Sequence, residues 1–175
     1  MTSELVNGYG DALVAVAKAE GAGPEVEDQL FTVARAVETS EELQTTLADS
    51  AIPVGRRQQI IEDLLESNAS PITSALISMV VAANRGDELT SILDAAVAKG
   101  AQSRGQSVAE VRSAVPLTDE QIQRLTAALN KATGKNLTIK TVVDEGVIGG
   151  IVTTIDDEVI DGSVRHRVTK LREAF

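Results

Sequence analysis

The chain has 175 residues, a formal net charge of −10 and 43% hydrophobic residues, an ordinary composition for a globular protein. It contains no cysteine, which excludes disulfides, thiolate nucleophiles and cysteine-ligated zinc. No apolar run approaches the roughly 20 residues of a membrane-spanning helix, and no basic, apolar leader opens the chain. We therefore expect a soluble, intracellular protein without direct membrane insertion.

Two parts of the chain differ in charge and in hydrophobic period. Residues 1–105 carry a net charge of −9, whereas residues 106–175 carry −1. The glycine-bearing segment KGAQSRGQS at 99–107 is typical of a linker. We therefore expect two domains, 1–105 and 106–175.

The first part has a helical period throughout. Its apolar residues recur three and four positions apart in six segments separated by short breaks, with Pro53 and Pro71 each suited to the first turn of a helix. Thr39 and the glutamate three positions later have the spacing of a capping box. This pattern predicts an N-terminal six-helix bundle.

The second part alternates between strand and helix patterns. Residues 107–115, 136–143 and 147–155 predict strands, the last as the partner of the strand before it, and VIDG at 159–162 follows another turn. A helix is expected from the capping box at Thr118 and Gln121 to Gly134. Ser163 can cap a final helix, whose apolar stripe is Val164, Val168, Leu171 and Phe175. The fold class expected is mostly α, with a small C-terminal α/β domain ending in a helix.

The residues that carry enzyme chemistry are scarce. The only histidine, His166, lies in the final helix between two arginines, which favours a solvent-facing residue over a general base. Gly149 and Gly150 lie between strands, so they indicate a bulge or a close backbone approach and not a dinucleotide-binding loop. We expect no catalytic residue and no cofactor.

The acidic cluster at 156–161 resembles a calcium loop only in part. Asp157, Asp161 and Gly162 fit the first, fifth and sixth loop positions. Val159 and Val168 occupy the third and twelfth, where oxygen ligands belong. The cluster therefore predicts a turn and no metal site.

The basic C-terminal segment contains Arg165, Arg167, Lys170 and Arg172. These cations could meet phosphates, but the rest of the chain is acidic and only 2% aromatic, which disfavours a nucleic-acid partner. They also complement the negative end of a helix dipole. Protein–protein binding is the remaining interpretation.

Three stretches resemble one family. The ending GGIVTTIDDEVIDGSVRHRVTKL resembles the C-terminal signature of the delta subunit of bacterial F-type ATP synthases, a relative of the mitochondrial oligomycin-sensitivity-conferring protein. YGDALVAVA is similar to the family's opening Tyr-Ala-x-Ala-Leu helix, and AEVRSAVPLTDEQIQRL to its strand–Pro-Leu-Thr–helix segment. The departures are Gly10, where the family has Ala, and Asp156, where it more often has Gly. The signature is matched by Gly149, Gly150, Asp157, Val159, Ile160, Asp161, Gly162, Ser163, Val164, Arg165 and Leu171.

The resemblance implies a non-catalytic stator subunit at the top of the peripheral stalk. Such a subunit keeps the catalytic head from rotating with the rotor during proton-coupled ATP synthesis. The implied partners are the alpha subunits of the head, with a beta-subunit contact left open, and stalk subunit b. The implied location is the cytoplasmic side of the cell membrane, through the complex.

The resemblance also implies two binding surfaces. A groove between the first and fifth helices would receive the N-terminal helix of an alpha subunit, and its residues here are Tyr9, Ala12, Leu13, Val16, Ala17, Met79, Val80 and Ala83. The C-terminal motif would dock the stalk through Gly149, Gly150, Asp157, Asp161, Gly162, Ser163, Val164, Arg165, Arg167, Val168 and Leu171.

Two alternatives stay open at this point. One is a helical protein-interaction adaptor unrelated to the synthase, which predicts no affinity for the catalytic head. The other is an enzyme that uses only carboxylates, such as Asp156 and Asp157 with Asp161, which predicts perturbed acidities in a cleft.

Overall fold

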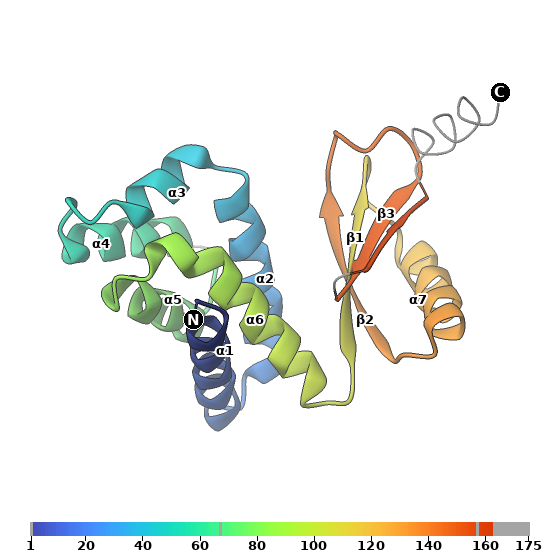
Figure 1. Ribbon diagram of the computed structural model, residues 1–175, viewed down its shortest axis with the longest axis horizontal. Coiled ribbons are helices and arrows are strands. Elements are labelled where there is room, and N and C mark those ends of the chain that lie inside the picture. The colour runs from blue at the N-terminus through green and yellow to red at the C-terminus, as the bar shows by residue number, and fades with distance from the viewer. Residues whose placement is uncertain (1, 67, 157, 163–175) are drawn as a thin grey trace. The chain divides into compact units, whose positions relative to one another are not determined.

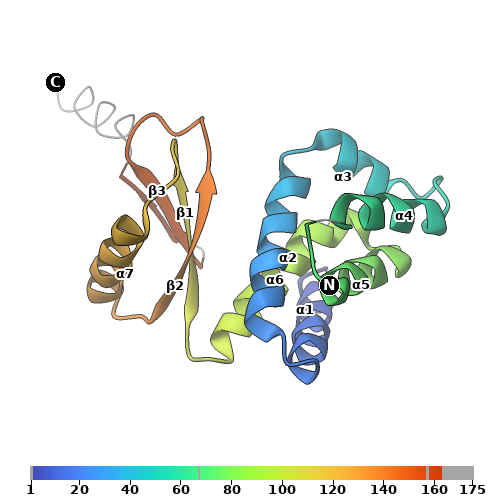
Figure 2. The ribbon, with the colours of Figure 1, turned by 180° about the vertical axis from the view of Figure 1, so that it is seen from behind.

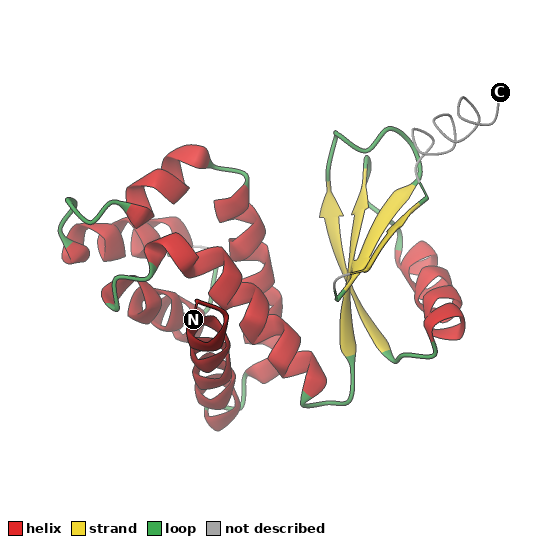
Figure 3. Ribbon diagram, in the orientation of Figure 1, coloured by secondary structure: helices red, strands yellow, loops and turns green. Residues whose placement is uncertain are grey.

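The computed structural model describes residues 2–66, 68–156 and 158–162. The chain folds as two compact units, Met1–Gly100 and Ala101–Phe175. The described residues form seven α-helices and one four-stranded sheet (Figure 3), which confirms a mostly helical chain with a small C-terminal sheet. Among these residues, no helix combines the length and the apolar character needed to cross a membrane.

The first unit is helical (Figure 1). Its elements are α1 (Thr2–Ala19), α2 (Gly23–Glu38), α3 (Glu41–Ala48), α4 (Val54–Leu65), α5 (Pro71–Ala82), the 3-10 turn η1 (Gly86–Glu88) and α6 (Leu89–Gln102), which ends just beyond the division. Helix α2 contacts α1, α3 and α5, and α5 also contacts α1 and α4. Figure 2 shows the α4–α5 pair from behind.

The helix starts follow local hydrogen bonding. Ser70 caps α5 and accepts a hydrogen bond from the Thr73 amide. The capping box expected at Thr39 is wrong, because Ser40 is the N-cap of α3 and accepts from the Leu43 amide. Thr39 instead ends α2, where its hydroxyl bonds the Ala36 carbonyl oxygen.

The interior of the first unit is built from small and branched aliphatic side chains. The buried members are Leu13, Val14, Ala17, Val26, Leu30, Phe31, Val33, Ala34, Val37, Leu47, Ile61, Leu65, Leu76, Ile77, Val80, Val81, Leu89, Ile92, Leu93, Ala96 and Val97. They come from all six helices, so burying them requires the helices to pack together.

One buried cation ties three chain segments of this unit together. Arg57 is 2% exposed and donates hydrogen bonds to the carbonyl oxygens of Leu47 (3.0 Å) and Ile52 (3.1 Å) and to Asn84 Oδ1 (2.7 Å). A side chain at Gly86 would overlap the same Leu47 carbonyl oxygen. The end of α3, the start of α4 and the turn after α5 therefore meet at one point.

The second unit contains a mixed sheet. Its elements are β1 (Ser107–Ser113), α7 (Asp119–Thr133), β2 (Leu137–Val143), β3 (Ile151–Ile155) and β4 (Glu158–Asp161), and the strand order is β2-β1-β3-β4. β1 pairs parallel with β2 and antiparallel with β3, and β4 pairs antiparallel with β3. The expected pairing of the 147–155 strand with the strand before it is wrong, because β1 lies between them. The parallel β1–β2 pair needs the α7 crossover, which leaves β1 in the centre.

Helix α7 covers one face of this sheet (Figures 1 and 3). The buried cluster between them consists of Ala109, Leu129, Leu137 and Ile155. The predicted capping box at Thr118 and Gln121 is confirmed, and Gly134 ends α7 with a φ of 69°. Local signals therefore set both ends of this helix.

Candidate docking surface

Helix α1 has one buried face and one exposed apolar face. Leu13, Val14 and Ala17 lie in the core, whereas Ala12 is exposed and Val16 is 39% exposed. Tyr9 is half-buried between the two faces. An exposed apolar face on a helix is typical of a surface that packs against another chain.

Helix α5, which contacts α1, shows the same division. Val80 is 1% exposed, but its neighbour Met79 is 57% exposed, and Ala83 at the end of the helix is also exposed. Methionine adapts its shape to different neighbours, which suits it to a binding surface.

The eight residues of the predicted groove therefore fall into two groups. Three of them, Leu13, Ala17 and Val80, are core residues and cannot reach a partner without repacking the unit. The five residues that remain, together with the exposed Leu5, form an apolar strip, which we define as Leu5, Tyr9, Ala12 and Val16 of α1 with Met79 of α5 and its C-cap residue Ala83.

An ion pair lies in the turn after α5, near Tyr9 of α1. Arg85 Nη1 lies 3.0 Å from Glu88 Oε2. This hydrogen bond and charge raise the pKa of Arg85, and Tyr9 contributes in the same direction. A fixed cation therefore lies beside the apolar strip.

A shallow hollow of about 260 Å³, open to solvent, lies on α1 at the N-terminal end of the strip. It is lined by Glu4, Leu5, Gly8, Tyr9 and Ala12. Leu5 and Gly8 were not among the predicted groove residues, although a glycine inside a helical period is itself a signal.

The motif of the second unit is described only in its first half. Gly149 and Gly150 have φ values of 65° and 81° in the loop before β3, a left-handed backbone that favours glycine. The Gly162 amide donates to the Ile151 carbonyl oxygen at 2.9 Å, and a Cβ at Gly162 would lie 3.2 Å from that oxygen. Glycine therefore permits a left-handed backbone before β3 and a close backbone approach just after β4.

The remaining predicted residues of this motif lie outside the described residues. They are Asp157, Ser163, Val164, Arg165, Arg167, Val168 and Leu171.

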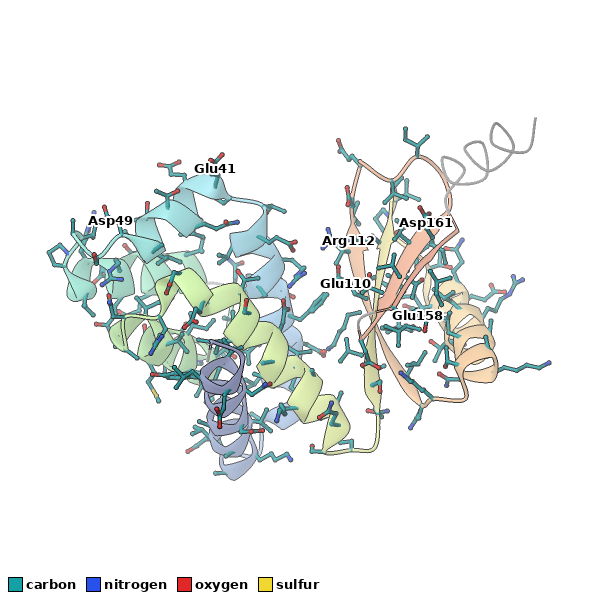
Figure 4. The ribbon with its side chains drawn as sticks, viewed as in Figure 1. Glu41, Asp49, Glu110, Arg112, Glu158 and Asp161 are labelled. Atoms are coloured by element: carbon teal, nitrogen blue, oxygen red, sulfur yellow. The ribbon has the colours of Figure 1, made fainter. Side chains whose placement is uncertain are left out.

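The two described carboxylates of the alternative enzyme site, Asp156 and Asp161, do not line the same hollow. Asp161 lines a hollow of about 280 Å³ with Arg112 and Asp144, and Figure 4 shows Asp161 on β4 and Arg112 on β1. Asp156 instead pairs with Lys135 (Oδ2 to Nζ, 2.6 Å) and does not line that hollow. Among the described residues, no three His, Asp or Glu side chains are grouped for a metal ion.

Comparison with known proteins identifies the family. The model of the ATP synthase delta (OSCP) subunit family matches residues 5–175. The chain belongs to this family. Similar relatives are the ATP synthase delta subunits of Frankia alni (38% identical over 166 residues) and Nocardia farcinica (36% over 165 residues). These matches cover 94% and 93% of this chain but only 60% of each relative, so the chain spans about three fifths of their length.

A solved structure has the same fold. A chain of the Toxoplasma gondii mitochondrial ATP synthase hexamer matches with a TM-score of 0.59 at 22% identity, covering 97% of this chain and 96% of that one. The similarity therefore extends over both units of this ATP synthase delta (OSCP) family member.

The structure gives a physical reason for one departure from the family pattern and a consequence of the other. A Cβ at Gly10 would lie 3.0–3.1 Å from atoms of Ala95 and Ala96 in α6, so an alanine there would require α1 and α6 to shift slightly apart. Asp156 has a φ of 53°, a conformation that the family's more usual glycine adopts without strain.

Proposed function

We propose that this chain is a non-catalytic stator subunit in the peripheral stalk of an F-type ATP synthase. It joins the catalytic head to the stalk and resists rotor torque during proton-coupled ATP synthesis. Membership of the ATP synthase delta (OSCP) family supports this role over that of an unrelated adaptor. The observation that carries the head contact is the apolar strip, where Val16 and Met79 remain exposed on two helices in contact.

The strip suits an amphipathic helix laid along α1 and α5. Small residues such as Ala12 and Ala83 permit close approach, and the larger Val16 and Met79 supply apolar area. The N-terminal helix of an alpha subunit is the partner that we assign to this surface. We assign the contact to the strip and not to the whole predicted groove, because Leu13, Ala17 and Val80 of that groove are buried in the core.

The apolar area of the strip is modest. Fully burying one aliphatic side chain contributes about 1.5–3 kcal/mol, so burying the exposed parts of Leu5, Val16 and Met79 contributes about 1 kcal/mol each. A micromolar complex requires about 8 kcal/mol. The partner must therefore supply further contacts along the edges of the strip.

The two units have separate roles in this proposal. Helices α1–α6 form a six-helix bundle, domain 1–105, which binds the head; domain 106–175 binds stalk subunit b through the motif from Gly149 to Leu171. The subunit lies on the cytoplasmic side of the membrane and is held there only through the complex. It binds no nucleic acid.

Calorimetric titration with a peptide that copies the N-terminus of the alpha subunit of the same organism tests the head contact. Binding at one-to-one stoichiometry is expected, and Ala12→Glu and Met79→Glu should each weaken it at least tenfold, because each places a carboxylate on the strip. Ala128→Glu makes the same change on the exposed face of α7 and should leave the affinity unchanged. No binding by the folded wild-type protein would overturn the head contact.

A second titration, with the soluble part of subunit b, tests the stalk contact. Ending the chain at Gly162 should abolish this binding while the affinity for the alpha-subunit peptide stays unchanged. Unaltered affinity for subunit b would move the stalk contact away from the C-terminal motif.

A further inference from the structure

Two glycines lie two positions apart in α1, and the structure requires only one of them. Glycine is a poor helix former, so each needs a reason. At Gly10 the reason is internal, because a Cβ would lie 3.0 Å from the Ala96 amide nitrogen in α6. At Gly8 a Cβ would meet nothing within 4 Å. Packing within the unit therefore leaves Gly8 unexplained.

The missing side chain at Gly8 leaves open space on the outer face of α1. The hollow of about 260 Å³ lies over this position, and its exposed lining is almost entirely apolar. Leu5, which is 47% exposed, lies one turn before Gly8, and Ala12 lies one turn after it. Any larger residue at position 8 would project into this space.

The hollow is continuous with the apolar strip. Leu5, Tyr9 and Ala12 belong to both. Glu4, the one charged residue of the five that line the hollow, lies at its edge. The surface therefore offers an apolar hollow with an anionic edge.

We propose that this hollow receives one large aliphatic or aromatic side chain of the alpha-subunit helix that docks along the strip. Gly8 then determines the register of that helix, because the inserted side chain can enter at only one point along α1. A lysine or arginine next to it in the partner would face Glu4. The proposal rests on the head contact described above, and it adds that Gly8 sets the position of the partner helix along α1.

The test compares two exposed helical glycines. Gly55 lies in α4, which contributes no residue to the strip, and a Cβ there also meets nothing within 4 Å. In titrations of the full chain with the alpha-subunit peptide, Gly8→Leu should weaken binding at least tenfold, or about 1.4 kcal/mol. Gly55→Leu should bind as the wild type does. Both variants should melt at or above the wild-type temperature, because leucine favours the helix.

A peptide scan identifies the inserted side chain. The large apolar residues of the peptide are replaced one at a time by alanine. At one position this replacement should lower the affinity for the wild-type protein tenfold and the affinity for the Gly8→Leu variant much less. Such a coupling marks a direct contact between the two positions.

The outcomes separate this inference from the function on which it rests. If the wild type binds and Gly8→Leu binds equally well, the inference is overturned and the head contact stands. If the wild type does not bind, the head contact falls and the inference falls with it. If Gly8→Leu lowers the melting temperature, Gly8→Ala and Gly55→Ala are compared instead. Gly8→Ala should then weaken peptide binding, by less than Gly8→Leu does, and Gly55→Ala should not weaken it.

Discussion

The two units of this chain are stabilised in different ways. The first buries aliphatic side chains from six helices and places a buried arginine among them. Among the described residues of the second, the buried cluster consists of Ala109, Leu129, Leu137 and Ile155, with Leu125 and Ile139 packed against it, and the sheet depends on strand pairing. A large core distributes the effect of a single change, whereas a small cluster offers few compensating contacts. Substitutions in the two units should therefore differ in size and in the part of the molecule that they unfold.

The largest effect is expected at Arg57 in the first unit. Arg57→Met keeps most of the side-chain length but leaves the buried Leu47 carbonyl oxygen without its donor, together with the partly buried Ile52 carbonyl oxygen and Asn84 Oδ1. Each unsatisfied acceptor costs about 1–3 kcal/mol, so a loss of about 3 kcal/mol or more in the free energy of unfolding is expected. Chemical denaturation of the full chain measures it.

Arg56→Met is the matched control, because Arg56 is the exposed neighbour of Arg57 on α4. It should change the free energy of unfolding by less than about 0.5 kcal/mol. Equal losses for the two variants would show that the three hydrogen bonds of Arg57 do not stabilise the unit.

The next effect tests the small core of the second unit. Ile155 is 3% exposed, and truncation to alanine should cost about 2–5 kcal/mol, against about 0.5–1.5 kcal/mol for Ile155→Val. Because few neighbours can fill the space, Ile155→Ala should unfold the second unit first. Calorimetry should then show a separate transition at lower temperature.

Ile92→Ala makes a comparable change in the first unit, where Ile92 is fully buried. It should move the transition of the helical unit and leave that of the second unit in place. A single transition that both variants shift equally would contradict the expectation that the two units unfold separately.

The helical unit and the sheet unit also differ in how much of their fold could be predicted from the sequence. In the first unit, helical periodicity indicated which faces are buried, because the period depends only on neighbouring residues. In the second unit, the Thr118 capping box and the Gly134 stop were equally local and were confirmed. The partner of the 147–155 strand was predicted wrongly, since pairing with β1 depends on a crossover that no local pattern encodes.

The candidate surface shows a similar limit. The spacing of Tyr9, Leu13, Val16 and Ala17 marked a helix face, but it could not separate Leu13, at 2% exposed, from Val16, at 39%. That distinction depends on which helix lies beside α1. The different roles of Gly8 and Gly10 likewise required the position of α6.

A smaller effect is expected at Asp156, whose φ of 53° lies in the left-handed region that favours glycine. Asp156→Gly and Asp156→Ala both remove the ion pair with Lys135. The difference between their free energies of unfolding therefore measures the effect of the backbone conformation alone. The glycine variant should be more stable than the alanine variant by about 1 kcal/mol. Thermal unfolding of the two variants side by side measures it, and equal stability would mean that the turn relaxes without strain.

The smallest effect concerns the ion pair itself. The hydrogen bond and the charge of Asp156 raise the pKa of Lys135 above its ordinary value of 10.5. Because the folded-state pKa exceeds that of the unfolded chain, the pair stabilises fully below about pH 10.5, and this contribution is lost as the pH rises through the raised pKa. The two side chains are 48% and 50% exposed, so solvent screens the pair and its contribution is small. An NMR titration of the Lys135 ammonium group should give a higher midpoint in the wild type than in Asp156→Asn. Identical midpoints would mean that the pair does not form in solution, and the strain at Asp156 would then have no compensating contact.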